Sequence, residues 1–164
     1  MSPENSASSN RIRNASLGDL PAIVAMLTAY REKLATWAPQ FWRPAIGASA
    51  MSSLHLGSLI GKNGHIFLVS ERGDKITGFA LALETPAPPV YAPGKTGTLD
   101  DFCVAEGESW ADTGAKLVEA IRRAAKDAGW QQLIVVSPQA DEAKNAVLQK
   151  AGLAVASQWW TTSL

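Results

Sequence analysis

From residue 96 onward the chain alternates between strand and helix patterns, and this alternation limits the folds open to it. The strand pattern of residues 96–104 leads to an amphipathic helix pattern over residues 113–128. Residues 131–137 form an apolar strand pattern of the kind buried on both faces, followed by a helix pattern over residues 141–151. Two strands joined through a crossover helix lie parallel in one sheet. We therefore expect helices packed on a sheet that is parallel at these crossovers.

The first part of the chain adds helices and a β-hairpin. Residues 20–34 carry one apolar stripe at helical spacing, after the capping-box pattern Ser16-Leu17-Gly18-Asp19. Residues 65–70 and 75–84 predict two strands joined by the tight turn Glu71–Asp74. The other predicted elements are an edge strand at 11–15, a weaker helix at 49–60 and an aromatic strand at 153–162. The fold class is therefore α/β (α+β), a mixed, mostly antiparallel central sheet with flanking helices in the order β-α-α-β-β-β-α-β-α-β.

Composition narrows the class of protein. We expect a disordered, Ser/Asn-rich tail at 1–10 and a single domain at 11–164. Fifteen basic and fifteen acidic residues give a formal net charge of zero, which disfavours nucleic acid and anionic membranes as partners. One cysteine and two histidines leave little material for disulfides or a metal site. Because the sequence shows neither a signal-peptide pattern nor a membrane-length apolar run, we expect a cytoplasmic protein without a metal.

The junction between the strand at 96–104 and the helix at 113–128 is the first place to look for chemistry. A helix that begins soon after a strand presents free backbone N–H groups and the positive end of its dipole, which suits a phosphate or another anion. Asp112 stands just before this helix. In one interpretation Asp112 is the N-cap, and its carboxylate takes the place of a phosphate oxygen. In the other, the loop is rearranged and Trp110 stacks on a ring of the ligand, although Trp110 also suits packing over the helix start.

Several short segments resemble the GNAT superfamily of acyl-CoA-dependent N-acyltransferases. Leu99–Val104 is similar to a strand of diamine-type acetyltransferases, Gly78 to a Gly-aromatic step, and Lys150–Leu153 to the family's helix-to-strand exit. The resemblance spans residues 11–162. It implies the GNAT fold and transfer of an acetyl or other acyl group from acyl-CoA to an amine, either a small-molecule amine or a peptide N-terminus.

The resemblance also implies where acetyl-CoA would lie. The backbone of Phe102, Cys103 and Val104 would pair with the pantetheine arm, and the helix start would hold the pyrophosphate. That helix start comprises Ser109, Trp110, Ala111, Asp112, Thr113 and Gly114.

The sequence departs from the family at positions that would bind or serve acyl-CoA. In the loop pattern Arg/Gln-x-x-Gly-x-Gly/Ala only Gly114 fits, since Ser109 and Asp112 occupy the other two positions. Leu148 stands where the family often has a tyrosine that protonates the CoA thiolate. Two functions therefore remain open. One is a GNAT-type N-acyltransferase, and the other is a GNAT-fold domain that binds a ligand or a partner protein without acetyl-CoA.

Acidic and aromatic residues are the candidates for the amine side of such a reaction. Adjacent residues of a strand point to opposite faces, so only one of Asp100 and Asp101 should face a substrate. Asp100 matches the family's acid and is the preferred general base, with Glu84 as a weaker candidate, although Asp100 equally suits an ion pair at the sheet rim. The aromatic residues around the first helix suit either cation–π contacts with an amine or simple packing. They are Tyr30, Trp37, Phe41 and Trp42.

Two further predictions concern isolated side chains. Cys103 lies in a strand and is expected to be a small buried residue rather than a nucleophile. Trp159 and Trp160 are adjacent on the last predicted strand, so we expect one to face inward and the other outward. The outward side chain would contact a sheet edge or take part in a homodimer interface.

Overall fold

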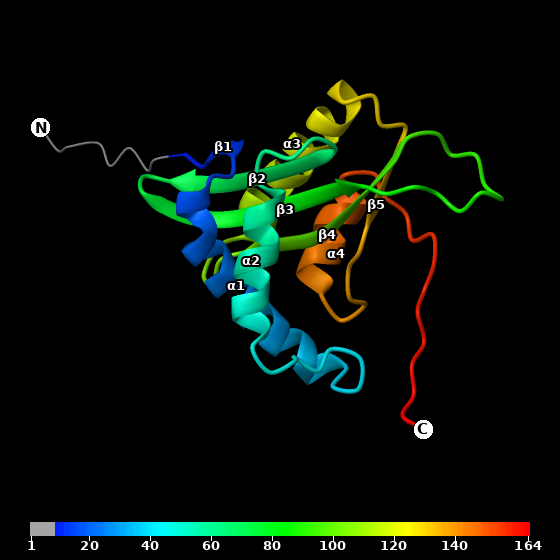
Figure 1. The fold of residues 1–164 in the computed structure, drawn as a ribbon, viewed down its shortest axis with the longest axis horizontal. Helices are drawn as coiled ribbons and strands as arrows, with labels where there is room; N and C mark the ends of the chain where they lie inside the picture. Colours follow the sequence, from blue (N-terminus) through cyan, green and yellow to red (C-terminus); the bar gives the residue numbers. More distant parts are fainter. Residues whose placement is uncertain (1–8) are drawn as a thin grey trace, which may run out of the picture.

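The computed structural model describes residues 9–164 and shows one five-stranded sheet with helices on both faces (Figure 1). The strand order is β1-β2-β3-β4-β5, antiparallel from β1 to β4 and parallel between β4 and β5. The strands are β1 (Arg11–Asn14), β2 (His65–Arg72), β3 (Lys75–Glu84), β4 (Thr96–Val104) and β5 (Gln132–Val135). This mixed, mostly antiparallel sheet confirms the predicted fold class. The tail expected at 1–10 falls mainly on residues 1–8, which lie outside the described residues.

The helices form one layer on each side of the sheet, as Figure 1 shows. They are α1 (Leu20–Trp37), α2 (Ala48–Leu59), α3 (Ala115–Asp127) and α4 (Glu142–Lys150), with a short 3-10 helix η1 (Leu17–Asp19) and a π-helical turn η2 (Trp110–Gly114). Residues of α1 and α2 pack on one face of the sheet around Phe79, and residues of α3 and α4 pack on the other around Phe102. Among the described residues, no helix is both long and apolar enough to cross a membrane.

The predicted capping box forms at the start of η1, which leads directly into α1. The backbone N–H and the hydroxyl of Ser16 both donate to the carboxylate of Asp19, at 2.7 and 2.9 Å. Arg13 of β1 donates to both oxygens of the same carboxylate, at 2.7 and 2.8 Å. Asp19 is buried, and the Arg13 guanidinium holds the pKa of its carboxyl well below the usual range. A local sequence pattern thus also ties the first helix to the edge strand of the sheet.

Three predictions about the last part of the chain are wrong, two on residues 153–164 and one on β5. Residues 153–164 form no strand, and Trp159 and Trp160 are both exposed, at 84% and 89%. The outer edge of β5 has no strand partner among the described residues, so the C-terminal segment adds nothing to the sheet. The third correction concerns β5, which was expected to be buried on both faces. Leu133 and Val135 pack on the core while Ile134 is 46% exposed, because the layer of α1 and α2 does not extend over this strand.

Candidate functional site

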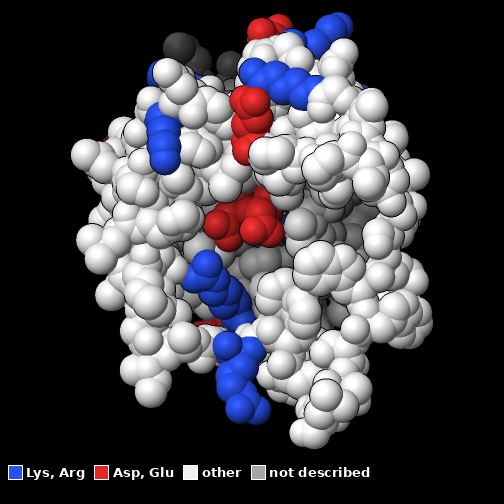
Figure 2. Space-filling view, turned by 45° about the vertical axis from the view of Figure 1, so that its right-hand side comes forward, with Lys and Arg blue, Asp and Glu red and all other residues white. Residues whose placement is uncertain are grey.

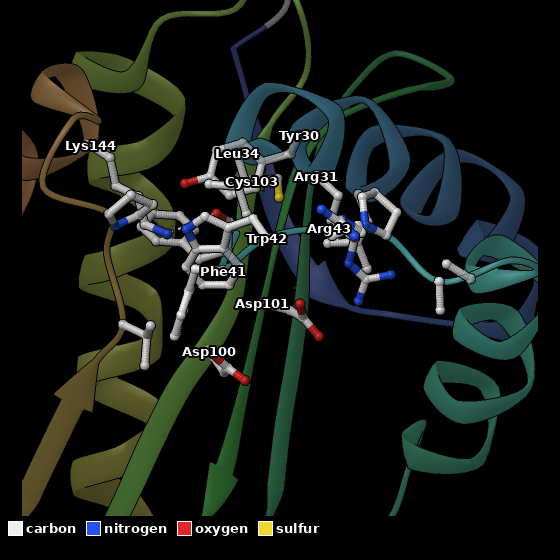
Figure 3. Close-up of a pocket in the computed structure, with 17 residues that line it drawn as sticks. Tyr30, Arg31, Leu34, Phe41, Trp42, Arg43, Asp100, Asp101, Cys103 and Lys144 are labelled. Atoms are coloured by element: carbon white, nitrogen blue, oxygen red, sulfur yellow. Dashed lines mark hydrogen bonds between the residues drawn. The ribbon is translucent and has the colours of Figure 1, made fainter. Parts of the chain in front are cut away.

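A cavity of about 320 Å³ opens between α1, the connection from α1 to α2, and the middle of β4. Charged and aromatic side chains from distant parts of the sequence converge on it, as Figure 3 shows. Lys144 enters from one side, and Arg31 and Arg43 lie on the other. The other chemically notable side chains of the lining are Tyr30, Phe41, Trp42, Asp100, Asp101 and Cys103.

A β-bulge brings both aspartates of β4 to this cavity. Leu81 of β3 pairs with Asp101, but the next residue, Ala82, pairs with Leu99, so Asp100 is an extra residue in β4. Because the bulge interrupts the alternation of side chains, Asp100 and Asp101 both line the cavity. The expectation that only one of them faces a substrate, made from regular strand geometry, is therefore wrong.

These two carboxylates have no partners among residues 9–164. Neither Asp100 nor Asp101 forms a side-chain hydrogen bond or an ion pair with any residue from 9 to 164. Burial raises the pKa of the Asp101 carboxyl, the charge of Asp100 raises it further, and Arg31 and His55 oppose the shift. Figure 2 shows acidic side chains gathered at a hollow of the surface with basic side chains directly beside them.

Lys144 is a site residue that the sequence analysis missed. Its side chain is 1% exposed, and its Nζ donates to the backbone carbonyl of Phe102 at 3.3 Å. The ammonium also lies 5.2–5.8 Å from the ring centres of Tyr30, Phe102 and Trp110. Burial lowers the pKa of Lys144, while neighbouring acids oppose this shift. A charged residue on a helix usually predicts a solvent-exposed face, and so no local signal identified Lys144.

Tyr30 and Asp141 hold the surroundings of Lys144 in place. The Tyr30 hydroxyl donates to the Asp141 carboxylate at 2.9 Å. Asp141 is the N-cap of α4, and its other carboxylate oxygen accepts from the backbone N–H of Lys144 at 3.2 Å. Burial and this carboxylate raise the pKa of Tyr30. Helix α1 is therefore hydrogen-bonded directly to the N-cap residue of α4.

The strands β4 and β5 separate next to Lys144. Their ladder ends where Leu99 faces Val135, with one last bond from the Val136 N–H to the Leu99 carbonyl at 3.1 Å. Beyond that point β5 no longer pairs with β4, so the backbone of Phe102 has no strand neighbour on this side. The Lys144 ammonium fills this gap and satisfies the Phe102 carbonyl.

The helix start at 109–114 differs from both interpretations of Asp112. Ser109 precedes the π-helical turn, and Asp112 lies inside that turn, where it pairs with Lys116 at 2.8 Å. The side chain of Asn10 donates to both Asp112 and Thr113, at 3.2 and 2.7 Å. The N-cap interpretation of Asp112 is therefore wrong, since an N-cap lies before the first turn rather than within it.

Trp110 is a packing residue over the helix start. Its ring meets Phe102 edge-on, with 4.9 Å between ring centres. A Cβ on Gly114 would lie 2.6 Å from the same ring, so Gly114 is required by close packing. In the alternative interpretation Trp110 would stack on a ligand ring, but the partly buried ring already contacts Phe102 and Gly114.

The residues present do not fit acyl-CoA as the resemblance implies it. The Lys144 ammonium occupies the gap beside Phe102 where the pantetheine arm would pair. The Asp112 carboxylate stands at the turn where the pyrophosphate would lie, and it accepts a hydrogen bond from Asn10 and forms an ion pair with Lys116. Leu148 packs in the core beside α3 and offers no proton.

Three of the predicted site residues lie away from the cavity or inside the core. Glu84 pairs with Lys95 at 3.3 Å, opposite Gly97, and is not part of the cavity lining. Trp37 packs under the Lys33 ammonium, 5.0 Å from the ring centre. Cys103 is 1% exposed, as expected for a buried residue, and burial raises the pKa of its thiol to about 12. No group of three or more His, Cys, Asp or Glu side chains in residues 9–164 is arranged to hold a metal.

The chain is similar to several solved structures along most of its length. A mutant of the BH1408 protein from Bacillus halodurans matches with a TM-score of 0.82 and 18% identity, over 94% of this chain and 99% of that one. A predicted acetyltransferase from Clostridium acetobutylicum, solved with acetyl-CoA, matches with a TM-score of 0.69 and 15% identity, over 94% and 96%. The ribosomal-protein-alanine N-acetyltransferase from Brucella melitensis biovar Abortus matches with a TM-score of 0.65 and 15% identity, over 95% and 100%.

Comparison by sequence adds no relative to these. No protein-family model matches the chain. No curated protein matches it either. The structural likeness nevertheless covers 94–95% of this chain, and several of the similar structures are described as acetyltransferases. The chain therefore has the fold of the GNAT superfamily.

Proposed function

We propose that this protein binds a small molecule with an ammonium group in the cavity between α1 and β4. The observation that carries the proposal is the pair of carboxylates, Asp100 and Asp101, which the β-bulge places together in the cavity lining. Two acids this close repel each other, and Asp101 is largely removed from water. Since no described residue forms an ion pair with them, a cationic ligand would relieve both the repulsion and the desolvation.

The rest of the lining suits the other parts of such a ligand. Phe41 and Trp42 meet edge-on, with 4.6 Å between ring centres, and give the cavity an aromatic wall. Aromatic faces attract cations and also pack against an apolar ligand body. Arg31 and Arg43 stand on the opposite side from Lys144 and suit a carboxylate or another polar acceptor on the ligand.

A second candidate is acyl transfer from acyl-CoA to the bound amine. The likeness to acetyltransferases, one of them solved with acetyl-CoA, favours it. In that reaction Asp100, which lines the cavity, would accept a proton from the amine. The amine-binding cavity is common to both candidates. They differ only in whether acyl-CoA reaches it past Lys144 and Asp112.

The test is a calorimetric titration with tyramine and, as a matched probe without the ammonium group, 4-ethylphenol. We expect tyramine to bind and 4-ethylphenol to bind at least about tenfold more weakly, since one charge-assisted contact supplies about 1.5–3 kcal/mol. Asp100→Asn and Asp101→Asn should each lower the affinity for tyramine about tenfold. Asp74→Asn, in the β2–β3 turn away from the cavity, should leave this affinity unchanged.

Two results would refute amine binding. One is equal affinity for tyramine and 4-ethylphenol. The other is the absence of binding for a panel of tyramine, agmatine, phenethylamine and a glycyl dipeptide at concentrations up to about 1 mM. Titration with acetyl-CoA in the presence of tyramine separates the second candidate. Binding of both together and release of a free thiol would support acyl transfer, and no acetyl-CoA binding would reject it.

A further inference from the structure

We infer that the side chain of Lys144 closes the gap between β4 and β5, here called the slot, and thereby keeps acyl-CoA from binding. Without this side chain the fold would leave the slot open. This inference does not rest on amine binding: Lys144 also lines the amine cavity, but the inference concerns the gap between β4 and β5 beside Phe102. Lys144 would then be the residue that distinguishes this chain from an acyl-CoA-binding protein of the same fold.

The slot itself is present in the backbone. Pairing between β4 and β5 stops at Leu99 and Val135, and the chain then turns away through Pro138 to the start of α4. A strand that loses its neighbour in the protein interior leaves carbonyl and N–H groups that need partners. The Phe102 carbonyl is such a group. An extended arm with amide groups would fit beside it in the manner of an added strand.

Lys144 supplies the partner from within the chain. Its Nζ bonds the Phe102 carbonyl at 3.3 Å, and three aromatic rings surround the ammonium. The side chain is 1% exposed, so protein atoms enclose it beside the Phe102 carbonyl. The Asp141 N-cap and its bond to Tyr30 fix the first turn of α4, which fixes the place from which Lys144 reaches in.

Displacing this side chain would be costly in two ways. Withdrawal of the ammonium leaves the buried Phe102 carbonyl without its donor until a ligand replaces it. It also removes the cation from three aromatic rings that attract it. An incoming arm must offset both losses before it gains any affinity. A closed slot therefore follows from the geometry, without any change in the backbone.

The experiment compares CoA binding by variants in the background of Asp112→Gly, so that the carboxylate at the helix start no longer opposes the phosphates. The probe is CoA, titrated by calorimetry against Asp112→Gly alone and against Asp112→Gly with Lys144→Ala. We expect the double variant to bind CoA at least about tenfold more tightly. Lys144→Ser in the same background is the reserve variant should Lys144→Ala fail to fold, as judged by circular dichroism.

Two controls separate closure of the slot from charge. Lys150 is an exposed residue of the same helix, and Lys150→Ala removes the same charge. Loss of a positive charge should weaken binding to the anionic CoA, so a gain seen only at position 144 has to come from the opened slot. Lys144→Met removes the charge but keeps most of the volume, and we expect it to leave CoA binding as weak as in Asp112→Gly.

Either of two results would overturn the inference. Micromolar CoA binding by the unaltered protein would show that Lys144 does not close the slot. A folded double variant that binds CoA no more tightly than Asp112→Gly would show that the slot is closed by something else. Both results are independent of the tyramine titrations, so failure of this inference and failure of amine binding can be told apart.

Discussion

Leu99 and Phe102 lie on the same face of the sheet, although they are three positions apart on one strand. Both pack in the core beneath α3 and α4, whereas Cys103 packs beneath α1. In a regular strand, residues three apart face opposite sides, so the extra residue Asp100 is required for both to be buried in the same core. One inserted residue thus serves the packing of the core and the composition of the cavity.

We predict that the chain still folds when one of the two adjacent aspartates is deleted. The shortened strand Leu-Asp-Phe-Cys alternates regularly, so Leu99, Phe102 and Cys103 keep their faces. Thermal unfolding should show a loss of about 1–2 kcal/mol or less, while tyramine affinity falls at least about tenfold. As a control, deletion of Ala80, at a regularly paired position of β3, turns part of that strand over and should abolish folding. Equal damage from both deletions would contradict this role of the bulge.

Asp101→Asn should stabilise the ligand-free protein and weaken its binding of the ligand. Burial raises the pKa of Asp101, so the folded chain holds this proton more tightly than the unfolded chain does. The stabilisation from that proton is complete at low pH and is lost as the pH rises from about 4 through the raised pKa. Asn carries no charge, so the variant should have a higher free energy of unfolding at pH 7 and a flatter pH profile. Chemical denaturation at several pH values measures both, and a less stable variant at pH 7 would show that Asp101 is paired after all.

Asp19→Asn should destabilise the protein and have the opposite pH signature. The Arg13 guanidinium lowers the pKa of Asp19, so its carboxylate stabilises the folded state above the ordinary pKa of about 4, and this is lost as the pH falls further. The variant should lose about 1–3 kcal/mol at pH 7, because Arg13 and Ser16 lose a charged acceptor. Acid unfolding of the two proteins should converge at low pH. A constant difference from pH 7 to pH 2 would contradict the ion pair as its source.

Gly78→Ala should be destabilising because the space beside Gly78 is already filled. A Cβ there would lie 3.0 Å from the Cys103 carbonyl oxygen and from side chains of Thr113 and Leu117. We expect a loss of about 1–3 kcal/mol in the free energy of unfolding, as in other overpacked cores. At Gly18 the nearest atom is 3.7 Å away, so Gly18→Ala should change stability by less than about 0.5 kcal/mol. Urea titrations of the two variants give the comparison, and similar losses would argue against tight packing at Gly78.

We predict that a second copy of the chain covers Trp159 and Trp160 in solution. Two neighbouring exposed tryptophans are costly in a monomer. The outer edge of β5 lies beside exposed Ile134, has no strand partner in residues 9–164 and can accept a strand. Dilution from about 100 μM to about 1 μM should shift tryptophan emission to longer wavelength and reduce the mass in light scattering. The variant Trp159→Ser with Trp160→Ser should be monomeric throughout, with the same circular dichroism. A monomer at all concentrations of the unaltered chain would reject the prediction.

Local patterns in the sequence predicted most of the fold. The stripe of α3, the capping box of Ser16 and Asp19, and the turn between β2 and β3 each depend on residues a few positions apart. Such patterns act through helix and strand periodicity and through local backbone hydrogen bonds, which is why they can be recognised without the tertiary structure. The aromatic candidates Tyr30, Phe41 and Trp42 line the cavity, and their contact with a substrate stays a prediction.

The sequence by itself determined the helices, the hairpin and the arrangement of helices packed on one sheet, because these follow from short-range spacing. Only the tertiary structure decided the bulge at Asp100, the burial of Lys144 and the unpaired C-terminal segment. A bulge exists only relative to the strand beside it, and the cage of Lys144 is built by Tyr30, Phe102 and Trp110 from three separate elements. Contacts between residues far apart in sequence leave no period in the chain, and those contacts set the chemistry of this cavity.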